Sequence, residues 1–88
     1  MGDLDPQLDQ FLRRQPSMGE GVYLASTAVV VGDVTLEDYS SVWYHAVLRG
    51  DINYIKVGAY TNIQDGAVVH LADEYGCEIG DWVTVGHS

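Results

Sequence analysis

At 88 residues the chain is long enough for one small domain. Apolar residues make up 47% of the sequence and charged residues 19%, which excludes an intrinsically disordered chain. Four basic residues against thirteen acidic ones leave a net charge of −9, which argues against binding to nucleic acid or anionic membranes. The single cysteine, Cys77, excludes an internal disulfide, and no secretory signal or membrane-spanning run is evident. These features predict a cytoplasmic protein.

The first segment predicts a short α-helix over residues 6–15. Pro6 suits the first helical position, and Pro16 ends the helix. Four apolar side chains fall on one of its faces: Leu4, Leu8, Phe11 and Leu12. The residues that follow, with two glycines, are typical of a linker. We therefore divide the chain into an N-terminal helix and linker over residues 1–21 and a second unit over residues 22–88.

From residue 24 onwards an aliphatic side chain recurs every six residues, with two longer steps of nine and ten. The ten positions are Leu24, Val30, Leu36, Val42, Leu48, Val57, Ile63, Val69, Ile79 and Val85. Uncharged and mostly small residues stand four places after most of them: Ala28, Val34, Ser40, Ala46, Ile52, Thr61, Ala67 and Val83. Alternating strands in hairpins would also repeat every six residues, but hairpins need turn dipeptides, which are scarce here. The period is typical of a parallel β-helix.

In this all-β fold, three hexads close one triangular coil, and each aliphatic residue points inward. The chain would form about three coils, with a three-residue extension at 49–54 and an acidic loop at 71–78. The N-terminal helix could cap the first coil. Since the last coil stops in mid-hexad, we expect this partial domain to be open at its C-terminal end and the chain to be a truncated form of a longer protein.

Two histidines are candidates for a metal site. His70 follows the inward Val69 and should point outward, and His87 comes seventeen residues later, close to one coil. Two histidines, a third ligand and a water position would suit a catalytic zinc. Ordinary surface or core histidines remain the alternative. His45, in a corner, is interpreted as structural or exposed.

A second candidate cluster contains Arg49. Arg49 and Asp51 share one face of an extended strand and can pair, and Asp65 follows roughly one coil later. An arginine held between two carboxylates would form a tie across a subunit interface or support an active site. A solvated ion pair of little energetic worth is the alternative.

Three segments in this order resemble the γ-class carbonic anhydrase family: 42–51 (VWYHAVLRGD), 61–70 (TNIQDGAVVH) and 79–88 (IGDWVTVGHS). The resemblance covers roughly residues 28–88. It implies a left-handed parallel β-helix that forms homotrimers, with one zinc (or iron or cobalt) ion at each subunit interface. It also implies reversible hydration of carbon dioxide to bicarbonate.

The resemblance assigns roles residue by residue. His70 matches the first metal ligand and His87 the second, the latter presented to the neighbouring subunit's site. Gln64 matches the glutamine that hydrogen-bonds the water on the metal, and Asn62 matches a nearby asparagine. Asp73 stands where the family's prototype has another acid and could transfer protons. Three charged residues match those that tie subunits together beside the metal: Arg49, Asp51 and Asp65.

The sequence also departs from the family pattern. The third ligand histidine would fall at position 92, beyond this chain, and Ile52 replaces a glutamate that the prototype uses in proton transfer. We therefore expect the 88-residue chain to lack detectable activity. Two other functions remain open: a hexapeptide-repeat acyltransferase, which uses the same coil with one histidine as base, and a non-catalytic trimeric scaffold.

Overall fold

The computed structural model describes residues 15–70 and 76–86, where every regular element is a strand. The strands are β1 (Ser17–Met18), β2 (Tyr23–Leu24), β3 (Val29–Leu36), β4 (Ser41–Val42), β5 (Val47–Val57), β6 (Asn62–Ile63), β7 (Val68–His70), β8 (Cys77–Ile79) and β9 (Thr84–Val85). The helix predicted over residues 6–15 lies, but for its last residue, outside this part. None of the described segments is a helix long and apolar enough to cross a membrane.

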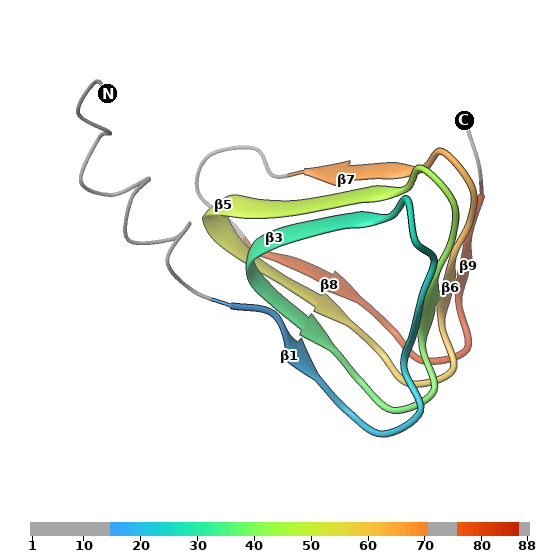
Figure 1. The fold of residues 1–88 in the computed structure, drawn as a ribbon. Coiled ribbons are helices and arrows are strands. Elements are labelled where there is room, and N and C mark those ends of the chain that lie inside the picture. Colours follow the sequence, from blue (N-terminus) through green and yellow to red (C-terminus); the bar gives the residue numbers. More distant parts are fainter. Residues whose placement is uncertain (1–14, 71–75, 87–88) are drawn as a thin grey trace.

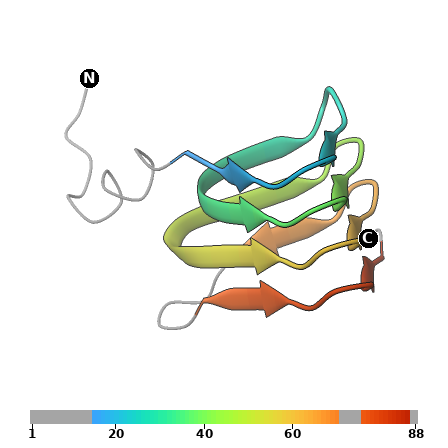
Figure 2. The ribbon, with the colours of Figure 1, turned by 90° about the horizontal axis from the view of Figure 1, so that it is seen from below.

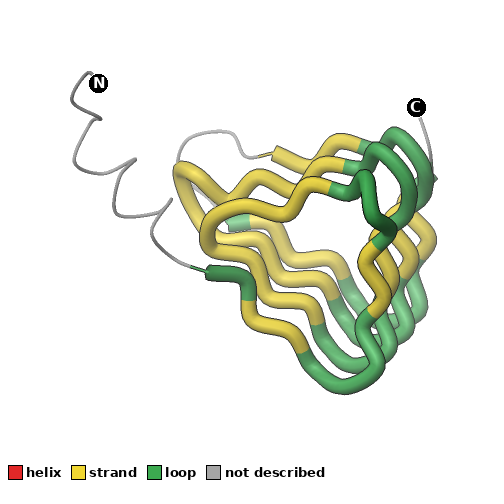
Figure 3. The backbone as a smooth tube through the Cα atoms, viewed as in Figure 1, coloured by secondary structure: helices red, strands yellow, loops and turns green. Residues whose placement is uncertain are grey.

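The strands form a parallel solenoid of about three turns. One sheet has the order β1-β3-β5-β7, with β8 also pairing with β5, and the other has the order β2-β4-β6-β9. Seen along its axis the chain traces a triangle (Figure 1), and from below the turns lie in stacked levels (Figure 2). Loops form two corners, whereas β3 and β5 run continuously around the third (Figure 3). The predicted fold class is confirmed, and it agrees with the left-handed winding that the family resemblance implies.

The register explains the irregular steps of the aliphatic series. Tyr23 lies beside Ser41, Ser41 beside Asn62, and Asn62 beside Thr84, so successive turns contain 18, 21 and 22 residues. The register shifts after Gly32, and Val34 pairs with Ile55. Ile55, which is buried, therefore takes the inward position of the longer turn that matches Val34, because three extra residues precede it.

The core is the column of side chains inside the triangle. All ten aliphatic positions belong to it or pack against it. Those of the middle levels have no exposed surface: Leu36, Val42, Leu48, Val57 and Ile63. The others are partly buried, because they lie in the first or last level of the described part, with a neighbouring level on one side.

Two local predictions were wrong. Ser17–Met18, assigned to a linker, form β1 and pair with Thr35 and Leu36 of β3. Cys77, assigned to the acidic loop, lies in β8 beside Ile55 and packs against the core. In both cases the pairing with a strand one turn away decides the conformation, and a two- or three-residue strand is too short to show a period.

Two aligned hydroxyl groups, those of Thr61 and Ser40, lie inside one corner. Replacing them should have opposite effects on stability. The Thr61 hydroxyl donates to the Gly80 carbonyl (2.6 Å) and accepts from the Val83 amide (3.1 Å). Ser40 lies one turn earlier, and its buried hydroxyl has no hydrogen-bond partner within residues 15–70 and 76–86. In urea denaturation, Thr61→Val should lower the free energy of unfolding by about 1–3 kcal/mol, whereas Ser40→Ala should leave it unchanged or raise it. An equal loss in both variants would contradict this assignment.

Candidate functional site

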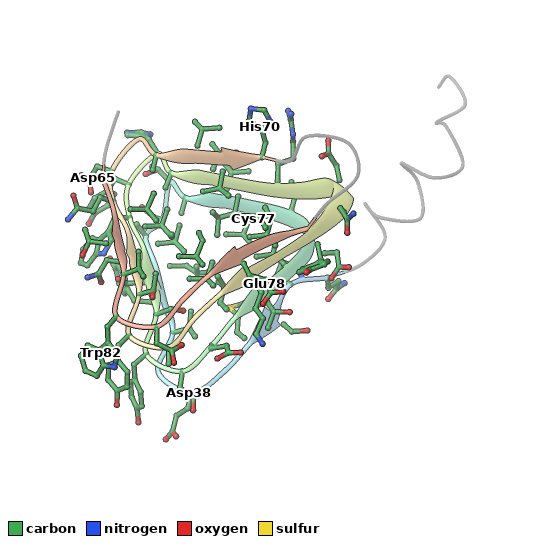
Figure 4. All side chains as sticks on the ribbon, turned by 180° about the vertical axis from the view of Figure 1, so that it is seen from behind. Asp38, Asp65, His70, Cys77, Glu78 and Trp82 are labelled. Atoms are coloured by element: carbon green, nitrogen blue, oxygen red, sulfur yellow. The ribbon has the colours of Figure 1, made fainter. Side chains whose placement is uncertain are left out.

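Arg49 and His70 lie side by side on the outer face of β3, β5 and β7. Val31, Arg49 and His70 occupy one register position on the three strands. They follow the inward residues Leu48 and Val69, so their side chains point outward, and both Arg49 and His70 are exposed. Since adjacent strands are about 4.8 Å apart, the aliphatic part of the Arg49 side chain and the His70 imidazole are direct neighbours. The predicted outward direction of His70 is confirmed (Figure 4).

Arg49 forms the predicted ion pair with Asp51. The Arg49 Nε atom lies 3.2 Å from the Asp51 Oδ2 atom, and the Asp51 side chain is only 17% exposed. The other carboxylate oxygen of Asp51, Oδ1, is buried and has no hydrogen-bond partner among the described residues. A buried carboxylate oxygen without a donor is unusual, and it marks a position that a further donor would stabilise.

Asp65 does not join this pair. Arg49 is aligned with His70 at the end of β7, whereas Asp65 lies at the corner that precedes β7 (Figure 4). The turn that joins Arg49 to His70 contains 21 residues, so Asp65 falls short of the same position one turn later. Asp65 therefore does not reach Arg49 within a single chain, and its predicted part in a tie between subunits stays a prediction.

Asn62 and Gln64 lie on another side of the triangle. They flank the inward Ile63 on β6, so both point outward, but from the sheet β2-β4-β6-β9. The Ser41 hydroxyl donates to Asn62 Oδ1, and the Trp43 indole N–H donates to the Ser41 hydroxyl (2.9 Å). These two hydrogen bonds engage Asn62 through its Oδ1 atom, so the amide NH₂ group is the part of this side chain that can donate a hydrogen bond.

Sequence reasoning missed Ser41 and Trp43. The only sequence signal for Ser41 is its position one 21-residue turn before Asn62, and that turn length is known only once the register is known. Tyr23 packs on Trp43 with ring centroids 4.9 Å apart, which further restricts the indole. A hydrogen bond with Tyr44 raises the pKa of Tyr23 above its ordinary value, so the Tyr23 phenol stays neutral at pH 7.

His45 lies at an exposed corner, in agreement with its interpretation as a surface residue. Its backbone is left-handed (φ 61°), and its amide donates to the Thr27 hydroxyl (3.0 Å). Within residues 15–70 and 76–86, no three His, Cys, Asp or Glu side chains gather to hold a metal ion. His87 and Asp73 lie outside the described residues, so their predicted roles stay predictions.

Comparison with known proteins identifies relatives over most of the chain. It is 54% identical over 70 residues to the "Probable carbonic anhydrase" of Methanocaldococcus jannaschii, a match that covers 80% of this chain and 44% of that protein. It is 47% identical over 81 residues to "Gamma carbonic anhydrase 2, mitochondrial" of Arabidopsis thaliana, covering 85% of this chain and 29% of the relative. Protein YrdA of Escherichia coli is 41% identical over 91 residues, covering 96% and 47%. The chain belongs to the γ-class carbonic anhydrase family.

No family model matches the chain. The chain spans less than half the length of these three relatives. Arg49 of β5 lies beside His70 at the end of β7 and pairs with Asp51, whereas Asn62 and Gln64 lie on the next side of the triangle.

Proposed function

We propose that the complete protein catalyses the reversible hydration of carbon dioxide to bicarbonate, at metal sites shared between three copies of the chain. The observation that carries this proposal is the aligned, outward pair Arg49 and His70, with a buried Asp51 oxygen that lacks a donor. The family relation supports the same chemistry, since relatives of this chain are named carbonic anhydrases.

The face that carries His70 suits contact with a second copy. Val29, Val47 and Val68 form an outward ladder two positions before Val31, Arg49 and His70. Val29 is 45% exposed and Val68 is 59% exposed, although both are aliphatic. Apolar side chains beside an arginine are typical of the buried centre of a protein interface. A copy placed here would cover the valines and could provide a donor for Asp51 Oδ1.

The residues present fit a divalent metal in part. His70 offers an exposed imidazole on a rigid strand, and neutral imidazole is a common ligand for zinc. A second ligand would be His87 of an adjacent copy. A bound zinc ion lowers the pKa of water to about 7, which makes a nucleophile available at neutral pH.

The chain's own residues would prepare the site for its substrate. The outward NH₂ group of Asn62, held by Ser41 and Trp43, would donate a hydrogen bond to an oxygen of carbon dioxide or bicarbonate. Gln64, two residues further along the same face, would orient the attacking water. Asp51 would hold Arg49 in place through the ion pair. Because Asn62 and Gln64 lie on a different side from His70, one complete site requires two copies.

Metal binding tests this proposal in the chain itself. Zinc affinity, measured by calorimetry, should fall more than about tenfold in His70→Ala, because a ligand matters at least as much as the groups that orient it. His45→Ala, which removes an exposed histidine at a corner, should leave the affinity unchanged. Sedimentation should show that zinc promotes trimers of the unmodified chain but not of His70→Ala.

Two results would contradict the proposal. Equal loss of zinc binding in both variants would assign the metal to nonspecific surface histidines, and trimers without metal would favour a non-catalytic scaffold. We expect no measurable hydration by the 88-residue chain in stopped-flow assays. A longer form of the chain, made by adding a segment with a histidine near position 92, should show activity in the same assay.

A further inference from the structure

Ser41 is buried although it points away from the core. It precedes the inward Val42 on β4, so its side chain lies on the outer face of the sheet β2-β4-β6-β9. Only 8% of the residue is exposed. Tyr23 lies beside it in register, and the Trp43 indole reaches back to its hydroxyl. The hydroxyl is largely shielded from water, so its hydrogen bonds have to come from protein groups.

The two hydrogen bonds at this hydroxyl run in one direction. An indole nitrogen is a donor only, so Trp43 donates to Ser41 (2.9 Å) and cannot accept from it. The Ser41 hydroxyl has one hydrogen, and it donates that hydrogen to Asn62 Oδ1. The chain from Trp43 through Ser41 to Asn62, which we call the hydroxyl relay, therefore ends on the acceptor atom of the Asn62 amide.

The opposite orientation of the Asn62 amide is unfavourable. With its NH₂ group turned toward Ser41, the hydroxyl would face two donors, the indole and the amide, and its own hydrogen would lose this acceptor. A buried donor that loses its acceptor destabilises the fold. The relay therefore sets which end of Asn62 is available to a ligand.

Aromatic packing holds the donor that starts the relay. The centroid of the Trp43 ring lies 4.9 Å from that of Tyr23 and 6.4 Å from that of Tyr44. Tyr23 and Tyr44 also form a hydrogen bond with each other. An indole packed against two rings that are joined in this way keeps one orientation, so its N–H stays directed at Ser41.

The relay lies in the middle of its sheet. Ser41 and Asn62 belong to β4 and β6, and each of these strands has a described strand on both sides. The outward residues in line with them are Tyr23 and Thr84. None of the described strands on this side carries a charged residue. A ligand here is recognised by hydrogen bonds from neutral groups, and Asn62 offers it a donor.

We infer that Ser41 and Trp43 are positioning residues that make Asn62 a permanent hydrogen-bond donor. The ligand class that fits is a small molecule with bare acceptor oxygens, such as carbon dioxide or a planar oxyanion of carbon, and a group with only N–H donors is excluded. This inference rests on the proposed function, in which Asn62 donates to carbon dioxide or bicarbonate. It adds that the Trp43 indole, acting through Ser41, decides the direction of that hydrogen bond.

NMR of the isotope-labelled chain without metal tests the direction of the relay. The NH₂ signals that disappear in Asn62→Ala belong to Asn62. In the unmodified chain these protons should show only a weak NOE to the β-protons of Ser41, because they point away from it. Trp43→Phe keeps a ring on Tyr23 but removes the donor, so the Ser41 hydroxyl can accept from Asn62 instead. The NOE should then grow severalfold.

Sodium formate is the probe for the ligand class, because formate is planar and has two acceptor oxygens and no strong donor. It should shift the Asn62 NH₂ signals until they saturate. Ammonium chloride supplies N–H donors at the same ionic strength and should leave these signals in place. The affinity for formate should fall about threefold to tenfold in Ser41→Ala and in Trp43→Phe, which is the effect of one net hydrogen bond.

Two matched variants make similar changes elsewhere. Ser40→Ala removes the neighbouring hydroxyl, which has no hydrogen-bond partner among the described residues. Trp82→Phe replaces the other tryptophan, whose ring stacks in a column with those of Tyr60 and Tyr39 at a different corner. Both variants should bind formate as tightly as the unmodified chain and should keep the weak NOE.

Three results would overturn the inference. The first is a strong NOE between the Asn62 NH₂ group and Ser41 in the unmodified chain, which would reverse the relay. The second is an unchanged affinity for formate in Trp43→Phe, and the third is a set of Asn62 signals that formate does not move or that ammonium moves equally. Trp43→Phe keeps Ser41 and an aromatic ring, so it decides the matter even where Ser41→Ala fails to fold.

The proposed function can fail separately from this inference. The NMR measurements use the chain without metal, whereas zinc calorimetry of His70→Ala tests the metal site. A relay with the expected direction in a chain that binds no zinc would uphold the positioning of Asn62 and contradict the proposed metal chemistry.

Discussion

Replacing Gly32 by alanine should lower the free energy of unfolding by about 2–5 kcal/mol. Gly32 lies at the corner where β3 bends, with φ 81°, a conformation that L residues with side chains rarely adopt. An added methyl group would lie 2.3 Å from the carbonyl oxygen of Gly50 on the next turn. Backbone atoms of a stacked turn cannot move aside, so steric overlap adds to the conformational penalty.

Gly66→Ala is the matched control for this prediction. Gly66 also has a positive φ (73°), but no atom lies within 4 Å of the position that a methyl group would take. The free energy of unfolding of this variant should fall by only about 1–2 kcal/mol, the conformational part of the penalty. Urea denaturation followed by circular dichroism measures both. If the free energy of unfolding falls equally in both variants, the steric overlap with the Gly50 carbonyl contributes nothing, contrary to the prediction.

Val57→Ala should lower the free energy of unfolding by about 2–3 kcal/mol. Val57 has no exposed surface and lies in the middle of the core column, between Leu36 and Ile79 in the neighbouring turns. The shorter side chain loses two buried carbon atoms and leaves a cavity. Stacked turns are held at the strand spacing by backbone hydrogen bonds, so they cannot close that cavity.

Val68→Ala makes the same chemical change at the surface. Val68 is 59% exposed on the outer face of β7, so the change should alter the stability of the single chain by less than about 0.5 kcal/mol. Chemical denaturation at low protein concentration, where copies do not associate, gives the comparison. A loss at Val68 as large as that at Val57 would mean that its side chain packs inward, contrary to the observed alternation.

The repeat made much of the fold predictable. An inward aliphatic residue at each hexad is a strong signal because every turn must fill the same column, and all ten residues pack there. The Arg49–Asp51 pair and the exposure of His70 were predictable for a similar reason, since alternation along one strand decides which side chains share a face. These features depend on local spacing alone.

Features that depend on turn length were less predictable. Asp65, which follows Asp51 by roughly one coil, lies at another corner of the same chain, and Ile55 takes the inward position that matches Val34 although it stands outside the hexad series. A turn extended by a few residues changes which residues become neighbours one level away. The sequence does not mark where the extra residues are accommodated, because a corner tolerates several lengths.

The amino-acid sequence by itself determined that this chain winds as a parallel β-helix, which side chains fill its interior, and which family it resembles, because each depends on residues close together in the chain. Only the tertiary structure decided that Arg49 lies beside His70, that Ser41 and Trp43 orient Asn62, and that three aromatic rings stack along one corner. Except for the hydrogen bond from Trp43 to Ser41, these contacts join residues about one turn apart. Their alignment depends on the length of each turn, which backbone pairing between strands sets and residue spacing does not.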